Sequence, residues 1–142
     1  MAHKARDLSE ALKSYLEADH YWGVSKGVGW GYDNNWDDVL LIQYFLNSID
    51  KTNLALDGIF GKKTQKAIRA YQKSCNGLLT TDGKVNAVDG TVLNINETYY
   101  IYTIYNLNIH YKDLKSVYYE DLRMDGKLPS ELVQIFSSWK NE

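Results

Sequence analysis

Two stretches decide the fold: residues 38–47, which read DVLLIQYFLN, and residues 56–73, which read LDGIFGKKTQKAIRAYQK. In both, apolar residues recur at the three- and four-residue spacing of an amphipathic helix. The first helix is predicted to begin after Asn35, with Asp38 at its third position, and to be buried on most sides. The second is predicted over residues 62–75, with one apolar stripe along it and an opposite basic stripe of Lys62, Lys66, Arg69 and Lys73.

The segment between these helices is predicted to form a rigid corner. Asp57 can close an Asx turn on the following backbone, and Gly58 tolerates the positive φ that such a turn requires. Phe60 is expected to plug the space between the helices, and Gly61 to serve as the N-cap of the second helix. Gln43 and Gln72 lie among apolar neighbours, so their amides are expected to be core or near-core groups that need hydrogen-bond partners.

The order Gln43, Asp57-Gly58-x-Phe60-Gly61, Thr64, Tyr71-Gln72 resembles the peptidoglycan-binding domain family, a helical cell-wall module often attached to wall hydrolases. The resemblance covers about residues 35–95 and includes an echo of the corner at Asp82-Gly83 and Asp89-Gly90, followed by Thr91. It departs from the family pattern at Lys62, where proline is usual, and at residues 86–88, which replace a tighter turn. The resemblance implies a three-helix core that recognises the bacterial wall without catalysis.

The rest of the chain is also predicted to be mostly helical, so the fold class is mostly α. Further helices are expected at residues 8–19, 97–112, 116–123 and 130–139, and a short extended piece around Val85, Val88 and Val92. The glycine-rich segment 23–31 is expected to be a loop. We therefore predict a single domain over residues 1–142, with a core at 35–95 and helical extensions at 1–34 and 96–142.

The candidate ligand-binding residues lie around the corner and on the later helix. The resemblance implies that the glycan or stem peptide meets the surface at the start of the second helix, through Lys63 and Thr64, and through Tyr71 if that ring is accessible. Asp57, Gly58, Phe60 and Gly61 are better explained as structural, although Asp57 stays a candidate contact. Tyr99, Thr103, Asn106 and His110 form a polar face on the helix predicted at 97–112, which is either solvated or a platform for sugars.

Two other groups of residues can each be interpreted either as structural or as ligand-binding. The basic stripe is either a solvated face or a contact for the carboxylates of a stem peptide. Four aromatic residues near the glycine-rich loop either pack that loop onto the core or form a binding patch; they are Trp22, Trp30, Tyr32 and Trp36.

Several function classes are disfavoured. The net charge of -2 gives no global argument for nucleic-acid binding, and no stretch is apolar enough to enter a membrane. His3, His20 and His110 lack the local spacing of a metal site, and no cofactor motif is present. Cys75 lies on a core stripe and is expected to be a buried thiol, not a nucleophile. An enzyme is therefore not predicted.

The favoured function is non-catalytic peptidoglycan binding that targets a partner or complex to the wall. A protein–protein adaptor of the same fold, for example in a secretion or injection apparatus, is the alternative, and a small wall hydrolase ranks third. Residues 1–22 lack the apolar segment of a Sec signal. We expect synthesis in the cytoplasm, and action at the wall or periplasm after export by another route.

Overall fold

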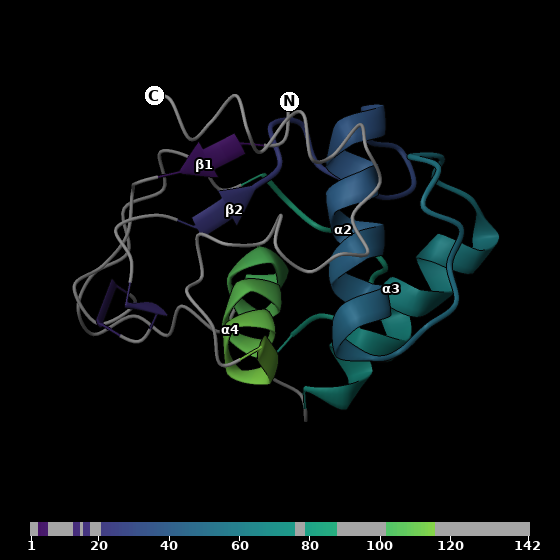
Figure 1. Ribbon diagram of the computed structural model, residues 1–142. Helices are drawn as coiled ribbons and strands as arrows, with labels where there is room; N and C mark the ends of the chain where they lie inside the picture. The colour runs from purple at the N-terminus through teal and green to yellow at the C-terminus, as the bar shows by residue number, and fades with distance from the viewer. Residues whose placement is uncertain are drawn as a thin grey trace.

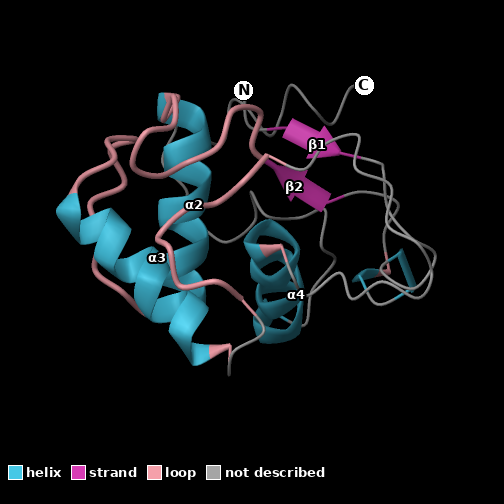
Figure 2. Cartoon of the chain, turned by 180° about the vertical axis from the view of Figure 1, so that it is seen from behind, coloured by secondary structure: helices cyan, strands magenta, loops and turns pink. Residues whose placement is uncertain are grey.

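The structure is a computed structural model that describes residues 3–5, 13–14, 16–17, 21–75, 79–87 and 102–115. Its elements are β1 (His3–Ala5), β2 (Tyr21–Gly23), α2 (Trp36–Ile49), α3 (Lys62–Ser74) and α4 (Thr103–Lys115). In both overall views α2 stands between α3 on one side and α4 on the other, and the small β1–β2 sheet lies next to one end of α4 (Figures 1 and 2). The prediction of a mostly helical fold is confirmed.

The central helix α2 is buried almost all round. Every residue from Asp37 to Leu46 is buried, as expected for a helix that carries apolar residues on most of its circumference. Asn35 occupies the N-cap position but makes no side-chain capping bond. The buried Asp38 carboxylate instead accepts hydrogen bonds from the backbone N–H groups of Ser25 and Lys26, which fix the glycine-rich loop to the helix.

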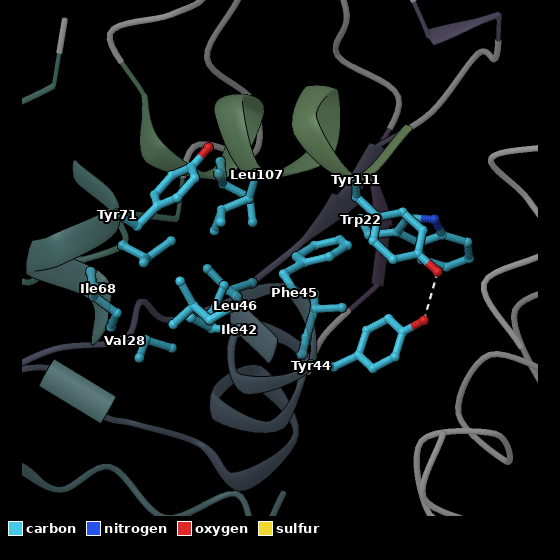
Figure 3. Close-up of a cluster of buried hydrophobic side chains, with 14 of the residues drawn as sticks. Trp22, Val28, Ile42, Tyr44, Phe45, Leu46, Ile68, Tyr71, Leu107 and Tyr111 are labelled. Atoms are coloured by element: carbon cyan, nitrogen blue, oxygen red, sulfur yellow. Dashed lines mark hydrogen bonds between the residues drawn. The ribbon is translucent and has the colours of Figure 1, made fainter. Parts of the chain in front are cut away.

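The core is formed where the three helices meet. Apolar side chains of α2 face Ile68 and Tyr71 of α3 on one side, and Leu107 and Tyr111 of α4 on the other (Figure 3). The phenol groups of Tyr44 and Tyr111 lie 2.6 Å apart and hydrogen-bond to each other inside this core. The rings of Tyr44 and Tyr111 therefore fill part of the core while their hydroxyl groups satisfy each other.

The side-chain amide of Asn108 bonds the sheet to α4. Asn108 of α4, fully buried, accepts a hydrogen bond from the backbone N–H of Trp22 at 2.8 Å and donates one to the carbonyl of Trp22 at 3.1 Å. It also donates to the carbonyl of Ile104 at 2.7 Å. The amide thus takes the place of a neighbouring strand for β2, which otherwise pairs only with β1 among the described residues.

Some expectations differ from the structure. Tyr102 is not helical, so α4 begins at Thr103 and extends to Lys115, later than the predicted 97–112. The antiparallel pair β1–β2 lies in the part of the chain predicted to be a helical extension. Its strands are three residues each, too short for the two-residue alternation to be evident in the sequence.

Other expectations fall wholly or partly outside the described residues. Of the predicted helix at 8–19, Lys13, Ser14 and Leu16 are helical. Val85 is extended and forms an isolated bridge with Val28, whereas Val88 and Val92 lie outside the described residues. The helices predicted at 116–123 and 130–139 also lie outside them.

We expect Asn108→Ala to lower the free energy of unfolding by about 2–4 kcal/mol, because it leaves the N–H and carbonyl of Trp22 without these bonds in the protein interior. Urea denaturation followed by far-UV circular dichroism measures this. The matched control is Asn53→Ala, at an exposed loop position, which should change stability by less than about 0.5 kcal/mol. Equal effects of the two substitutions would contradict the role given to Asn108.

Candidate functional site

The corner between α2 and α3 is organised by the side chain of Gln43. Its amide nitrogen lies within hydrogen-bonding distance of three acceptors: Asp57 Oδ1 at 3.1 Å, the Ile59 carbonyl at 3.1 Å and Thr64 Oγ1 at 3.2 Å. Its amide oxygen accepts a hydrogen bond of 3.0 Å from the backbone N–H of Gly58. One buried glutamine therefore holds the turn and the first residues of α3 together, which explains why a polar residue lies on the apolar helix α2.

The turn itself has the predicted geometry. Asp57 Oδ1 accepts a hydrogen bond of 2.9 Å from the backbone N–H of Ile59, which is the Asx turn, and Gly58 has φ of +71°. The N–H of Ile59 and then the amide of Gln43 hold the pKa of the Asp57 carboxyl below its ordinary value. The carboxylate therefore stays ionised on an exposed corner.

The outer surface of this corner is apolar. A Cβ atom at Gly58 would lie 2.6 Å from the carbonyl oxygen of Trp36, so the turn packs directly against the first residue of α2. The Trp36 side chain is 53% exposed, and Ile59, next to Gly58, is 68% exposed. We call Trp36, Asp57, Ile59 and Lys63 the corner surface: two exposed apolar side chains with an ionised carboxylate and a lysine at its edge.

The same arrangement occurs a second time between α3 and α4. The Gln72 amide nitrogen lies 3.2 Å from Asp82 Oδ1, 3.0 Å from the Lys84 carbonyl and 3.1 Å from Thr103 Oγ1. Its amide oxygen accepts a hydrogen bond of 2.9 Å from the backbone N–H of Gly83, whose φ is +73°. The echo seen in the sequence at Asp82-Gly83 is thus a true structural repeat.

The threonine of this second corner is Thr103 at the start of α4, which accepts a hydrogen bond from Gln72. Thr91, which follows Asp89-Gly90 in the sequence echo, lies outside the described residues. Thr103 had been placed on a polar, solvated face, and it is buried. The corresponding position of Thr64 at the start of α3 is the signal that could have identified it.

The predicted ligand contacts divide into exposed and buried groups. Asp57 and Lys63 are exposed, as a contact residue must be. Thr64 and Tyr71 are buried, with 4% and 1% of their surface exposed, so the expected exposed contact at Thr64 is wrong and Tyr71 is not accessible. Asn106 is buried too, so it is not an exposed member of the predicted sugar platform, and Tyr99 lies outside the described residues. Thr64 is covered because it bonds to Gln43 of α2, and Tyr71 because its ring belongs to the core between the helices.

The aromatic residues of the glycine-rich loop also divide. Trp22 is buried in the core and Tyr32 is half-buried, whereas Trp30 is 75% exposed. The turn that carries Trp30 is closed by Asn34, which accepts a hydrogen bond of 2.7 Å from the N–H of Gly29 and donates one of 2.8 Å to its carbonyl. Trp30 is therefore presented to solvent on a fixed turn, as a second exposed aromatic site.

A shallow hollow lies elsewhere, between α4 and the C-terminal ends of α2 and α3. It measures about 430 Å³ and is lined by Ile49, Asp50, Tyr71, Ser74, His110 and Asp113. The Tyr71 hydroxyl lies 2.6 Å from His110 Nδ1, which keeps both groups paired. Burial raises the pKa of both the Tyr71 phenol and the nearby Cys75 thiol, so both stay protonated at neutral pH. Neither is activated as a nucleophile.

Two further features bear on ligands. No group of three or more His, Cys, Asp or Glu side chains suited to a metal ion occurs in the part of the chain that the structure describes. Across the same residues, no helix is both long and apolar enough to cross a membrane.

The two glycines offer a matched test of the corner. Gly58→Ala and Gly83→Ala both place a side chain at φ near +70°, which costs about 1–2 kcal/mol. At Gly83 the added Cβ meets only the flexible side chains of Gln65 and Arg69, at 3.1 Å, whereas at Gly58 it meets the backbone of Trp36. We expect Gly58→Ala to be less stable than Gly83→Ala by about 1–3 kcal/mol in urea denaturation. Equal losses would show that the turn does not depend on its contact with Trp36.

The comparisons with known proteins agree with this geometry. The family described as "Putative peptidoglycan binding domain" matches residues 36–88, which include α2, α3 and both glutamine residues with their Asp-Gly turns. No curated protein and no solved structure matches the chain. The family match and the two glutamine-centred corners thus identify residues 36–88 as a segment similar to the peptidoglycan-binding domain family.

Proposed function

We propose that this chain is a non-catalytic peptidoglycan-binding module that targets a partner or complex to the bacterial wall. The wall polymer would bind at the corner surface. The observation that carries the proposal is the exposed indole of Trp36, a residue whose backbone packs against the turn that Gln43 holds. We further propose that the protein acts at the wall or in the periplasm, where this ligand is found.

The chemistry of the corner surface suits a glycan strand. A broad, apolar ring such as that of Trp36 can stack on the C–H face of a sugar, and Ile59 widens the apolar area beside it. Asp57 and Lys63 offer a carboxylate acceptor and an ammonium donor for hydroxyl, amide or stem-peptide groups. Because hydrogen bonds fix the turn before the ligand arrives, little conformational freedom is lost on binding.

The proposal that the module is non-catalytic is supported by the side chains of the hollow between α4 and the ends of α2 and α3. Its tyrosine is paired with His110 and kept protonated, and so is the thiol beside it. The Asp50 carboxyl has a raised pKa because it is partly buried, against the opposing charge of His110. A raised pKa makes the Asp50 carboxylate a better general base. The hollow, however, holds no activated nucleophile on which such a base could act.

A protein–protein adaptor is the second candidate. The observation that favours it is Trp30, which is exposed on a fixed turn, because tryptophan is enriched among the residues that dominate protein interfaces. In that case the same fold would hold a protein at the loop and not a glycan at the corner.

Co-sedimentation with purified peptidoglycan sacculi tests the proposal. We expect the wild-type protein to pellet with sacculi without lowering the turbidity of the suspension. Trp36→Ala should weaken binding by about tenfold or more, because it removes the central apolar contact. The variant's circular dichroism spectrum and midpoint of denaturation show whether it is folded.

Trp30→Ala is the matched control, since it also removes an exposed tryptophan but leaves the corner surface intact. It should pellet like the wild type. Failure of the wild type to pellet would refute wall binding and leave the adaptor as the better proposal. Clearing of the suspension would refute the non-catalytic assignment.

A further inference from the structure

The outer face of α3 carries a dense group of positive charges. All five basic residues of this helix are exposed; they are Lys62, Lys63, Lys66, Arg69 and Lys73. At about 100° per residue they occupy a sector of about 120°, opposite the buried face of Ala67, Ile68 and Tyr71. We call these five residues the basic face.

Charge in this protein is strongly segregated. The sequence has 16 basic and 18 acidic residues, and α3 holds five of the basic residues and no acidic one. The remainder of the chain therefore has 11 basic against 18 acidic residues, a net charge of -7 against +5 on α3. A nearly neutral total hides a positive face on a negative protein.

The stability of α3 does not explain this arrangement. Lys62 and Lys63 lie in the first turn, where the helix dipole disfavours positive charge. The spacings Lys62–Lys66, Lys66–Arg69 and Arg69–Lys73 place like charges at neighbouring positions of the helix surface. Within the described residues, no carboxylate forms an ion pair with any of the five. The helix therefore tolerates unfavourable electrostatics that an external anion would relieve.

The basic face is open and continues from the corner surface. Ala70 is exposed among the charged side chains, so no bulky residue stands up from that part of the helix. Lys63 belongs to both surfaces, and from Lys62 to Lys73 the helix rises about 17 Å. A polymer seated at Trp36 could therefore extend a charged branch along α3.

We infer that the basic face of α3 binds the carboxylates of peptidoglycan stem peptides while the glycan strand lies at the corner surface. The inference rests on the proposed function and adds the chemical part of the ligand that each surface takes. Exposed charge pairs are weak one by one, but three or more acting on a repeating polyanion change affinity measurably and in a salt-dependent way.

The test combines a charge-neutral variant with a charge-neutral ligand. Lys66→Gln, Arg69→Gln and Lys73→Gln are combined in one protein, which leaves the corner surface and Lys62 unchanged. Its binding is measured on untreated sacculi and on sacculi whose carboxylates have been converted to amides. We expect the triple variant to bind untreated sacculi about tenfold more weakly than the wild type, with a shallower dependence on salt.

On amidated sacculi the wild type should lose a similar factor, and the triple variant should lose little more, because the two changes remove the same contact. Lys26→Gln, at an exposed lysine outside α3, is the control for net charge and should bind like the wild type. The inference is overturned if the triple variant binds untreated sacculi as tightly as the wild type. It is also overturned if amidation weakens binding of the triple variant by the same factor as binding of the wild type. A third contrary outcome is that stripping phosphodiester polymers from the sacculi, and not amidation, removes the extra affinity of the wild type.

The two proposals fail in different ways. If the wild type does not pellet at all, both the proposed function and this inference fall. If the wild type pellets and depends on Trp36 but is indifferent to the triple substitution and to amidation, only the assignment of the stem carboxylates to α3 falls.

Discussion

The fold depends on one kind of hydrogen bond, in which a buried glutamine side chain accepts from the backbone N–H of a glycine held at positive φ. It is made by Gln43 with Gly58 at 3.0 Å and by Gln72 with Gly83 at 2.9 Å. The positive φ turns the glycine N–H inward, and the amide supplies the acceptor that no strand or helix provides there. Because an unpaired polar group in the interior is costly, each glutamine fixes its turn in one conformation.

The repeat links the three helices in sequence. The glutamine of α2 reaches the threonine at the start of α3, and the glutamine of α3 reaches the threonine at the start of α4. Each helix thereby sets where the next begins, and their apolar faces then close on a common core (Figure 3). This order also produces the two exposed surfaces. The corner surface is the side of the first turn that stays exposed once the helices pack, and the basic face is the side of α3 that stays exposed.

The two exposed surfaces differ in the physics by which they would bind. Stacking on Trp36 depends on apolar area and a fixed geometry, and responds little to salt. Attraction to the basic face acts over a longer range and weakens as salt increases. A module with both would combine charge-driven capture of the wall with a shape-dependent contact to its glycan, on elements that the core holds rigid.

The sequence by itself determined α2, α3, the Asx turn at Asp57 and the positive φ at Gly58, because helix periodicity and turn chemistry are local properties of the chain. It also identified both glutamines as buried amides in need of partners. Tertiary structure alone decided that Thr64, Tyr71 and Asn106 are covered, that Trp30 and Trp36 are exposed, and that Thr103 completes the second corner. A polar residue on a helix has the same periodicity whether it meets water or another element, so only the packing of neighbouring elements determines which polar groups remain available to a ligand.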